Sequence, residues 1–258
     1  MSRPETSAPI LRYGTVDSAL TVLARIARDA PGPAPLTTVV ARHQTGGRGR
    51  SGRAWADDPG SLLLAVLVDV PDADLSWTTP VAGLAVAAAI ADLGHRPRLK
   101  WPNDVLVDGR KVAGILCEHI DSPTALRPLH RVGVGIGLNL GTVPSGAGPL
   151  AGALDLAGAD RDETAESLIL AIRDGLARLL AADRPAWKRD YERLLARPDA
   201  PCSVRLPDGA RLDVRPTGVD DDGALLALDA DSRPIRIAVG DVDLPSSTGP
   251  RPPSGVHA

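Results

Sequence analysis

A glycine-rich segment at residues 46–53, Gly-Gly-Arg-Gly-Arg-Ser-Gly-Arg, limits the folds open to this chain of 258 residues. It follows a β-branched run at 37–43 that predicts a strand, and its glycine spacing matches the G-x-G-x-x-G dinucleotide fingerprint. That fingerprint requires a helix directly after it, because the helix N-terminus binds the pyrophosphate. Here residues 56–60 are Ala-Asp-Asp-Pro-Gly, which end any regular element. The sequence therefore argues against a Rossmann fold and predicts a polar loop over residues 44–60.

This loop carries three guanidinium groups, on Arg48, Arg50 and Arg53. Glycines allow backbone N–H groups to approach an anion closely, and arginine offers a planar set of donors that stays charged. An ordinary solvated basic loop is the alternative. The flanking Gln44 and Trp55 favour function, so we expect the loop to bind phosphate.

A second cationic segment is Lys100-Trp-Pro-Asn-Asp104, in a chain that has 26 arginines and only 3 lysines. Pro102 fixes its own φ angle and biases Trp101 toward an extended conformation, so we expect Lys100 at a rigid strand end, exposed toward a cleft. From there its ammonium group would bridge a carboxylate and an α-phosphate. A surface lysine beside a turn is the alternative. For Asn103 and Asp104, turn chemistry and a functional role remain equally open.

The remaining pattern predicts an α+β fold, in which a mixed β-sheet packed with helices precedes a small β-barrel. We expect helices at 18–29, 79–93, 162–183 and 185–196, and strands at 37–43, 62–68, 98–101, 105–107, 111–119 and 131–140. Short alternating strands follow within 201–244, and Asp108-Gly109 predicts a hairpin turn. The expected division is one domain at 11–197, a barrel domain at 201–245, and disordered tails at 1–10 and 246–258.

Glycines occupy alternate positions 133, 135 and 137 of one predicted strand, so all three face the same side of the sheet. Gly114 places another small residue in a neighbouring strand. Glycine within a strand marks close approach of a ligand or of another backbone. Tight helix packing and ligand binding both remain open for this face.

Composition excludes several classes of function. A net charge of −3 gives no basic field for nucleic acid, and the apolar stretch Val81–Ala91 is shorter than the ~20 residues that a membrane span needs. Cys117 and Cys202 lack metal-type spacing, as do His43, His95, His119 and His130, so we expect no protein-only metal site. The first ten residues hold no secretory apolar run. We expect a cytoplasmic protein with no nucleic-acid or membrane partner.

Four segments in this order and spacing resemble the biotin protein ligase family: residues 43–55, 100–106, 109–116 and 135–139. The resemblance extends over about residues 12–244. It implies a class II synthetase-like biotin/lipoate ligase catalytic domain at 11–197 and an SH3-like barrel at 201–245. No helix-turn-helix precedes residue 10, so the form without an N-terminal DNA-binding domain is expected.

The resemblance also implies a reaction. Biotin and ATP, with Mg²⁺, would give biotinyl-5′-AMP and pyrophosphate, and a lysine of a biotin carboxyl carrier domain of a biotin-dependent carboxylase would then accept the biotin. Lys100 and Arg50 would be catalytic, Gln44 would contact biotin, and the loop around Arg48 and Gly49 would fold over the adenylate. The residues expected to bind biotin or the adenylate are Ser18, Gln44, Gly47, Arg48, Gly49, Arg50, Arg53, Trp55, Lys100, Asn103, Gly114, Gly135 and Asn139.

The chain departs from the family at two segments. Ser18-Ala19-Leu20 stands where the family usually has Ser-Thr-Asn, and Ala151-Gly-Ala-Leu154 where Ala-Thr-Ser-Leu is common. Losing one hydrogen bond to a buried ligand group costs roughly 1–3 kcal/mol. Two alternatives therefore remain: a lipoate- or octanoate-type ligase of the same fold, or a homologue that binds biotin or carrier without turnover. Oligomeric state, the carrier's identity and the barrel's role stay open.

Overall fold

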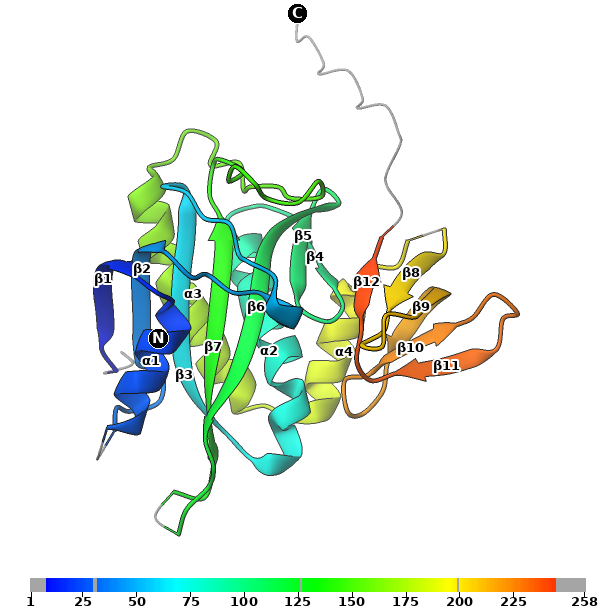
Figure 1. Ribbon diagram of the computed structural model, residues 1–258, viewed down its shortest axis with the longest axis horizontal. Helices are drawn as coiled ribbons and strands as arrows, with labels where there is room; N and C mark the ends of the chain where they lie inside the picture. The colour runs from blue at the N-terminus through cyan, green and yellow to red at the C-terminus, as the bar shows by residue number, and fades with distance from the viewer. Residues whose placement is uncertain (1–7, 30–31, 126, 199, 245–258) are drawn as a thin grey trace, which may run out of the picture.

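The structure, a computed structural model, describes residues 8–29, 32–125, 127–198 and 200–244 and contains two β-sheets (Figure 1). The larger sheet has seven strands in the order β1-β2-β3-β7-β6-β5-β4, and the smaller has five in the order β11-β10-β9-β8-β12. The strands of the larger sheet are β1 (Ile10–Val16), β2 (Thr38–Gln44), β3 (Ser61–Val70), β4 (Pro97–Lys100), β5 (Asp104–Val107), β6 (Arg110–Asp121) and β7 (His130–Asn139). Those of the smaller are β8 (Cys202–Arg205), β9 (Arg211–Val219), β10 (Leu225–Leu228), β11 (Pro234–Ile237) and β12 (Asp241–Asp243).

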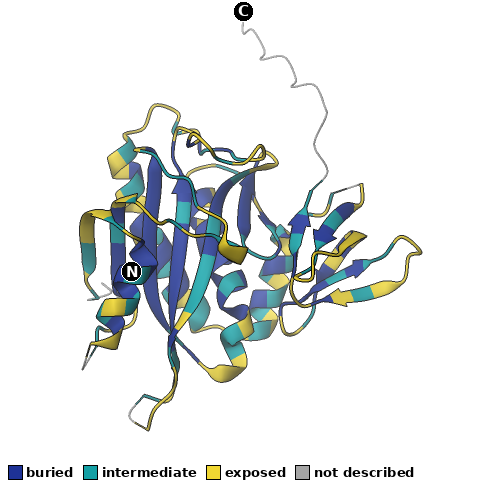
Figure 2. Ribbon diagram, in the orientation of Figure 1, coloured by how far each residue is buried: buried dark blue, intermediate teal, exposed yellow. Residues whose placement is uncertain are grey.

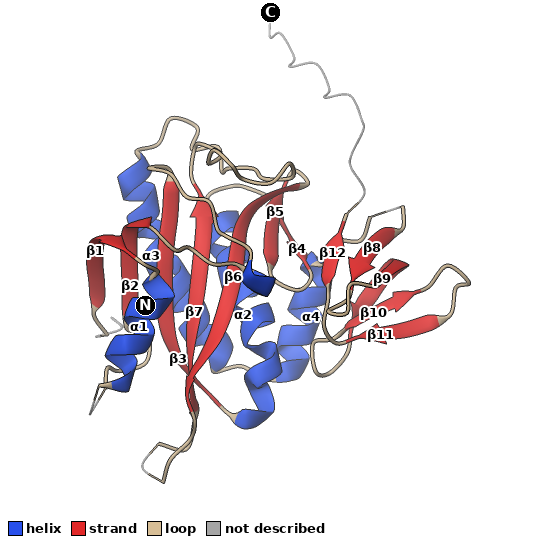
Figure 3. Ribbon diagram, viewed as in Figure 1, coloured by secondary structure: helices blue, strands red, loops and turns tan. Residues whose placement is uncertain are grey.

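Helices cover both faces of the larger sheet (Figure 3). They are α1 (Ala19–Arg28), α2 (Thr78–Asp92), α3 (Arg161–Leu180) and α4 (Arg184–Leu194), with short 3₁₀ helices η1 (Arg50–Gly52) and η2 (Asp72–Trp77). The predicted helices and strands are confirmed to within a few residues at each end. The predicted α+β class is confirmed as well, and the antiparallel smaller sheet is compatible with an SH3-like barrel.

The larger sheet is mixed, because β1 and β2 are parallel while every other neighbouring pair is antiparallel. This order is not the parallel, doubly wound sheet of a Rossmann fold. Strand β1 was not predicted, because its residues are mostly exposed and lack an alternating apolar pattern. Ile10, expected in the N-terminal tail, begins this strand; residues 1–7 and the predicted tail 246–258 lie outside the described residues.

Strand β3 is buried on both faces, as its continuous apolar sequence requires. Leu62, Leu64 and Val66 pack into the large core beneath α2 and α3, while Leu63 and Ala65 pack against α1. Figure 2 shows the resulting dark, buried centre of the sheet. Alternate residues of β3 therefore point to opposite faces of the sheet. One face is covered by the large core, and the other is left for α1 and the glycine-rich loop.

Helix α2 packs against both the sheet and α3, which explains its composition. The segment Asp72–Asp92 is long and apolar enough to cross a membrane, but 67% of its most apolar window is buried inside the protein. A Cβ atom added at Gly175 of α3 would lie 3.2 Å from the Cβ atom of Ala85, so small residues let the two helices approach closely. Burial against α3 and the sheet therefore explains the hydrophobicity of α2.

The smaller sheet is joined to the larger one by buried aromatic residues. Trp77 Nε1 donates to Asp221 O at 2.7 Å, and Trp101 Nε1 donates to Gly223 O at 3.0 Å. The ring of Trp77 also packs at a tilt against that of Trp187 of α4, with their centroids 6.1 Å apart. One continuous core includes residues of both sheets, so β8–β12 have a fixed position beside β4 and α4 (Figure 1).

Replacing Trp77 by alanine should lower the free energy of unfolding by about 3–5 kcal/mol, because a fully buried ring and its hydrogen bond to the smaller sheet are both lost. Urea denaturation followed by circular dichroism measures this change. Leu170→Ala, at an exposed position of α3, is the matched control and should change stability by less than about 1 kcal/mol. A Trp77→Ala variant as stable as this control would contradict the assignment.

Candidate functional site

The glycine-rich loop crosses the face of the larger sheet and is fixed at both ends (Figure 1). The Asp57 carboxylate accepts a hydrogen bond from Gln44 N at 2.9 Å and contacts His43 Nδ1 at 3.0 Å. Within the loop, Trp55 N donates to Gly47 O at 2.9 Å and Gly49 N donates to Arg53 O at 2.7 Å. These bonds hold the predicted loop in one shape over the sheet.

The row of glycines on β7 is covered by two side chains. A Cβ atom at Gly135 would lie 2.5 Å from Leu20 Cδ1, and one at Gly137 would lie 2.3 Å from the Trp55 ring. A Cβ atom at Gly114 would also meet this ring, at 2.7 Å. Helix α1 and the loop therefore pack on the same glycine face. Both contacts are possible only because these positions carry no side chain.

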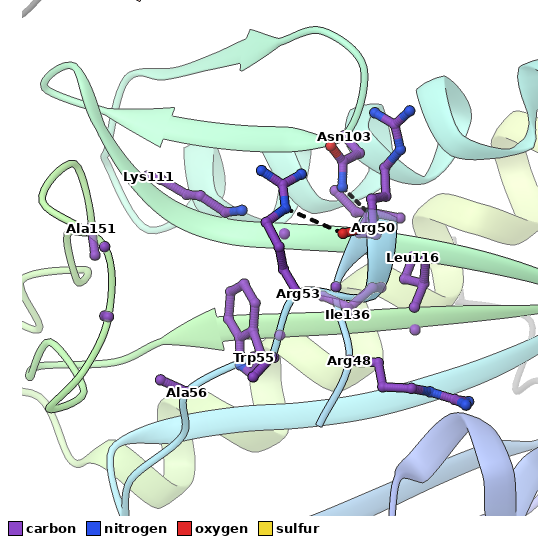
Figure 4. Close-up of a pocket in the computed structure, with 18 of the residues that line it drawn as sticks. Arg48, Arg50, Arg53, Trp55, Ala56, Asn103, Lys111, Leu116, Ile136 and Ala151 are labelled. Atoms are coloured by element: carbon purple, nitrogen blue, oxygen red, sulfur yellow. Dashed lines mark hydrogen bonds between the residues drawn. The ribbon is translucent and has the colours of Figure 1, made fainter. Parts of the chain in front are cut away.

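A cavity of about 410 Å³ opens between this glycine face and the loop. Every site residue predicted from the sequence lines it except Gly47 and Lys100; the lining residues among them are Ser18, Gln44, Arg48, Gly49, Arg50, Arg53, Trp55, Asn103, Gly114, Gly135 and Asn139. The size is typical of a small-molecule site. In Figure 4, the ends of Lys111 and Arg53 lie close together above Trp55, Arg50 extends upward beside them, and Arg48 extends in the opposite direction.

A buried carboxylate, Asp104, lies between two lysines beside this cavity. Its oxygens are 2.8 Å from Lys100 Nζ and 2.6 Å from Lys111 Nζ. Burial alone raises the pKa of Asp104, but the two ammonium groups outweigh it and leave the pKa below 3.8. We call Asp104, Lys100 and Lys111 the lysine cluster; it carries a net positive charge.

A second carboxylate, Asp241 of β12, lies between two arginines of the loop. Arg50 Nη1 is 3.1 Å from one Asp241 oxygen, and Arg53 Nη2 is 2.9 Å from the other. Burial lowers the pKa of Arg50, and Asp241 opposes part of that effect. We call Arg50, Arg53 and Asp241 the arginine cluster. Lys100 Nζ connects the two clusters, because it also donates to Val242 O at 2.7 Å.

The predicted exposure of Lys100 toward the cleft is wrong. Its side chain is only 16% exposed, lies beneath β12, and does not line the cavity. Lys111, 32% exposed, does line it, and its Nζ atom is 5.4 Å from the centre of the Trp55 ring. Lys111 is absent from the predicted site residues, although the rarity of lysine in this chain is a signal that applies equally to Lys111 and Lys100.

Several predicted site residues line the cavity and also form hydrogen bonds or ion pairs with other parts of the protein. Gln44 Oε1 accepts from Ala19 N at 2.8 Å and so caps α1, at whose N-terminus Ser18 lies buried. Asn103 Nδ2 donates to Ile115 O at 2.7 Å. Arg48 pairs with Glu118 at 3.2 Å, outside both clusters. The loop arginines therefore have different partners, and only Arg50 and Arg53 share a carboxylate.

Two buried polar atoms in the cavity lining have no partner among the described residues: Trp55 Nε1, a donor, and Asn139 Oδ1, an acceptor. Asn139 Nδ2 donates to Gly152 O at 2.8 Å, so the amide orientation is fixed and its oxygen is left over. Unpaired buried polar atoms are costly, and a ligand carrying both a donor and an acceptor would satisfy them.

Residues 146–151 form a further wall that the sequence did not predict as part of the site. Lys111 N donates to Leu150 O and Gly152 N donates to Lys111 O, each at 2.8 Å, which holds this segment against the start of β6. Its Gly- and Pro-containing sequence indicates a loop but gives no signal of where that loop packs.

Among the described residues, no group of three or more His, Cys, Asp or Glu side chains is placed to hold a metal ion. Asp243, a carboxylate in the cavity lining, pairs with Arg211 at 3.2 Å. Asp104 is likewise paired, so both carboxylates have cationic partners.

Comparisons with known proteins found similar sequences and similar folds. A sequence model of the biotin/lipoate A/B protein ligase family matches residues 28–139. Biotin–[acetyl-CoA-carboxylase] ligase of Mycobacterium tuberculosis is 34% identical over 215 residues, covering 79% of this chain and 77% of that protein. The enzyme of the same name from Paracoccus denitrificans is 39% identical over 121 residues, which is 45% of this chain and 49% of that protein. A biotin protein ligase from Aquifex aeolicus, solved with biotin and ATP, superposes with a TM-score of 0.69 at 24% identity, covering 91% of this chain and 97% of that chain, which shows a shared fold.

Asp104→Asn should lower the free energy of unfolding by about 3 kcal/mol at pH 7, because two lysines lose their shared buried counter-ion. The folded-state pKa is lowered, so this stabilisation is present above the unfolded pKa of about 3.9 and is lost as the pH falls through the folded value. The stabilities of the wild type and the variant should therefore approach each other as the pH falls below about 4. Denaturation at pH 7, 5 and 3 measures this. Asp108→Asn, in the exposed hairpin turn, should change little at any pH; equal pH profiles for both variants would contradict the role of Asp104.

Proposed function

Because this chain belongs to the biotin/lipoate A/B protein ligase family, we propose that it is an ATP-dependent biotin–protein ligase. In the first half-reaction the biotin carboxylate attacks the α-phosphorus of MgATP, a P–O bond forms, and pyrophosphate leaves. In the second, a lysine amine of a carrier protein attacks the acyl carbon, and AMP leaves with the electron pair of the broken C–O bond. The products are biotinyl-lysine and AMP.

The observation that carries this proposal is a pair of net-positive clusters beside one cavity. A carboxylate and a triphosphate repel each other, so a site that joins them must supply fixed positive charge where the two meet. Lys111, Arg50 and Arg53 line the cavity and supply such charge. A single carboxylate in each cluster keeps the cations in place and leaves each cluster positive.

The two lysines take different roles in this proposal. Lys111 lines the cavity and is placed to contact the reacting carboxylate and the α-phosphate. Lys100 is a positioning residue, because it holds Asp104 and β12 rather than facing the cavity. Arg50 keeps the catalytic role expected of it, as a cation that orients the phosphate.

The order of residues along β7 indicates how substrates lie. Gly135 lies beneath Leu20 near the N-terminus of α1, Gly137 lies beneath Trp55, and Asn139 contacts the segment at 146–152. Strand geometry places Gly135 and Asn139 roughly 13 Å apart. We place the acid at the Gly135 end, the adenine at the Asn139 end, and the phosphates between them near Lys111. The unpaired Asn139 Oδ1 would accept a hydrogen bond from the exocyclic amine of adenine.

The carrier is a biotin carboxyl carrier domain of a biotin-dependent carboxylase, in line with the name of the mycobacterial relative. The cytoplasm is the proposed compartment, since ATP and the acceptor protein are available there. We also propose that the chain divides into a catalytic domain at 11–197 and a barrel domain at 201–245, and that the site residues have the roles given above.

A lipoate- or octanoate-type ligase is the second candidate, and Leu20 favours it. This apolar side chain is buried at the acid end of the cavity, where the family usually has a polar residue. A hydrocarbon or dithiolane acid lacks the ureido group that needs polar partners there. A homologue that binds biotin without turnover is the third.

ATP–pyrophosphate exchange tests these candidates directly. We expect exchange that depends on biotin, with lipoate and octanoate at the same concentration giving less than a tenth of that rate. A reaction without acid is the control. Exchange supported by lipoate or octanoate but not biotin would establish the second candidate. Biotin binding by calorimetry with no exchange at millimolar biotin would establish the third.

Lys111→Ala should lower kcat/KM for biotin-dependent exchange by about 100-fold or more, because it removes the ammonium group that faces the reacting groups. Its stability should change little, since Lys111 is partly exposed. Lys100→Ala should lower both activity and the free energy of unfolding, the latter by about 1–3 kcal/mol, through its lost bonds to Asp104 and Val242. Lys188→Ala, at the remaining lysine, is the matched control and should leave exchange unchanged. Normal turnover in Lys111→Ala would remove its assigned role.

A further inference from the structure

Strand β12, the short last strand of the smaller sheet, contacts both charged clusters. Its first residue, Asp241, contacts two arginines of the glycine-rich loop, and its second, Val242, accepts a hydrogen bond from Lys100 through its carbonyl oxygen. The loop and β12 are about 190 residues apart in the chain. The third residue, Asp243, lines the cavity itself.

The hydrogen bonds of Arg50 leave part of its guanidinium available. Arginine carries five N–H donors in a fixed plane. In the described part of the chain Arg50 uses Nη1 for both Gly240 O and Asp241 Oδ1, each at 3.1 Å. Its Nη2 and Nε donors are therefore free for a phosphate, while the bonds through Nη1 fix the plane of the group beside the cavity.

Asp241 also holds together two groups that repel each other. Arg53 Nη2 donates to the other Asp241 oxygen at 2.9 Å, and Arg53 Nε donates to Arg50 O at 3.2 Å. Without the carboxylate, two guanidinium groups in one short loop would separate into solvent, and Arg53 is already 52% exposed. Arg48 provides an internal comparison: it has no partner in β12, pairs instead with Glu118, and points away from Arg50 and Arg53 (Figure 4).

We propose that Asp241 is a positioning residue for adenylate formation: it holds Arg50 and Arg53 toward the phosphates of the nucleotide, so that the barrel completes the active site. The proposal rests on the proposed function and assigns the barrel a role in that reaction. Asp241 acts through the arginines and touches no reacting atom. Both oxygens are engaged and the side chain is only 14% exposed, which fits a fixed support.

The opposite possibility is that Asp241 acts as an internal anion that competes with phosphate for the same arginines. The two roles predict opposite signs when the charge is removed. A positioning residue makes nucleotide binding weaker when it is lost, whereas a competitor makes it tighter.

Asp241→Asn tests this, because it keeps the side-chain size and removes the charge. We expect the KM for MgATP in the exchange reaction to rise about tenfold or more, with the KM for biotin changing less than about twofold. Asp241→Glu should recover part of the loss, since it restores the carboxylate. Asp231→Asn is the matched control, because this exposed carboxylate lies in the turn between β10 and β11 and forms an ion pair only with Arg233 among the described residues.

Calorimetric binding of MgATP to the same variants separates this proposal from the proposed function. If the wild type lacks exchange, the proposed function fails, yet a tenfold weaker Kd for MgATP in Asp241→Asn would still support positioning. If the wild type exchanges and Asp241→Asn matches it in both KM and Kd, positioning alone is overturned. Tighter MgATP binding in the variant overturns it in favour of competition. If the KM values for MgATP and biotin rise equally and the Tm falls, the positioning role is overturned and the contact is purely structural.

Discussion

The arrangement of this site depends on the sharing of two carboxylates among four cations. Two like charges 4 Å apart repel each other by about 4 kcal/mol at an effective dielectric of 20, so cations gathered beside an anion-binding cavity need fixed counter-ions when no substrate is bound. Asp104 meets this need for Lys100 and Lys111, and Asp241 meets it for Arg50 and Arg53. Each carboxylate offsets the charge of one of its two partners, so each cluster keeps one net positive charge. Because these six residues come from the loop, β4, β5, β6 and β12, the charge arrangement also fixes how these elements meet.

The larger sheet gives this cluster of charges a rigid base. One face of β3 and β7 packs on α2 and α3, and the opposite face of β7 carries only glycines where the loop and α1 approach. Side chains at those positions would collide with Leu20 and Trp55, so the glycines set the depth of the cavity. Leu20 also gives the cavity an apolar wall, beside the polar groups of Ser18 and Gln44.

Much of the fold could be predicted from local pattern. The continuous apolar run of β3 and the strand-breaking residues at 56–60 determined the elements around the loop. Asp108 and Gly109, both with positive φ, formed the expected hairpin turn. Strand β1 escaped prediction because an exposed edge strand lacks alternation, and β12 escaped because three residues are too few to show a period. The glycine-rich loop, Gln44, Gly114, Gly135 and Asn139 were all found by motif and lie at the cavity.

By itself the sequence determined the elements, the family resemblance and most residues that line the cavity, because these follow from hydrophobic period, turn chemistry and local motifs. Only the tertiary structure decided which lysine faces the cavity. Lys100 and Lys111 lie on different strands around Asp104, and the direction of each side chain depends on strand pairing and on the position of β12. Tertiary structure also brought Asp241 to the loop arginines. Contacts between residues so far apart in the chain are set by the packing of whole elements, and no local pattern encodes them.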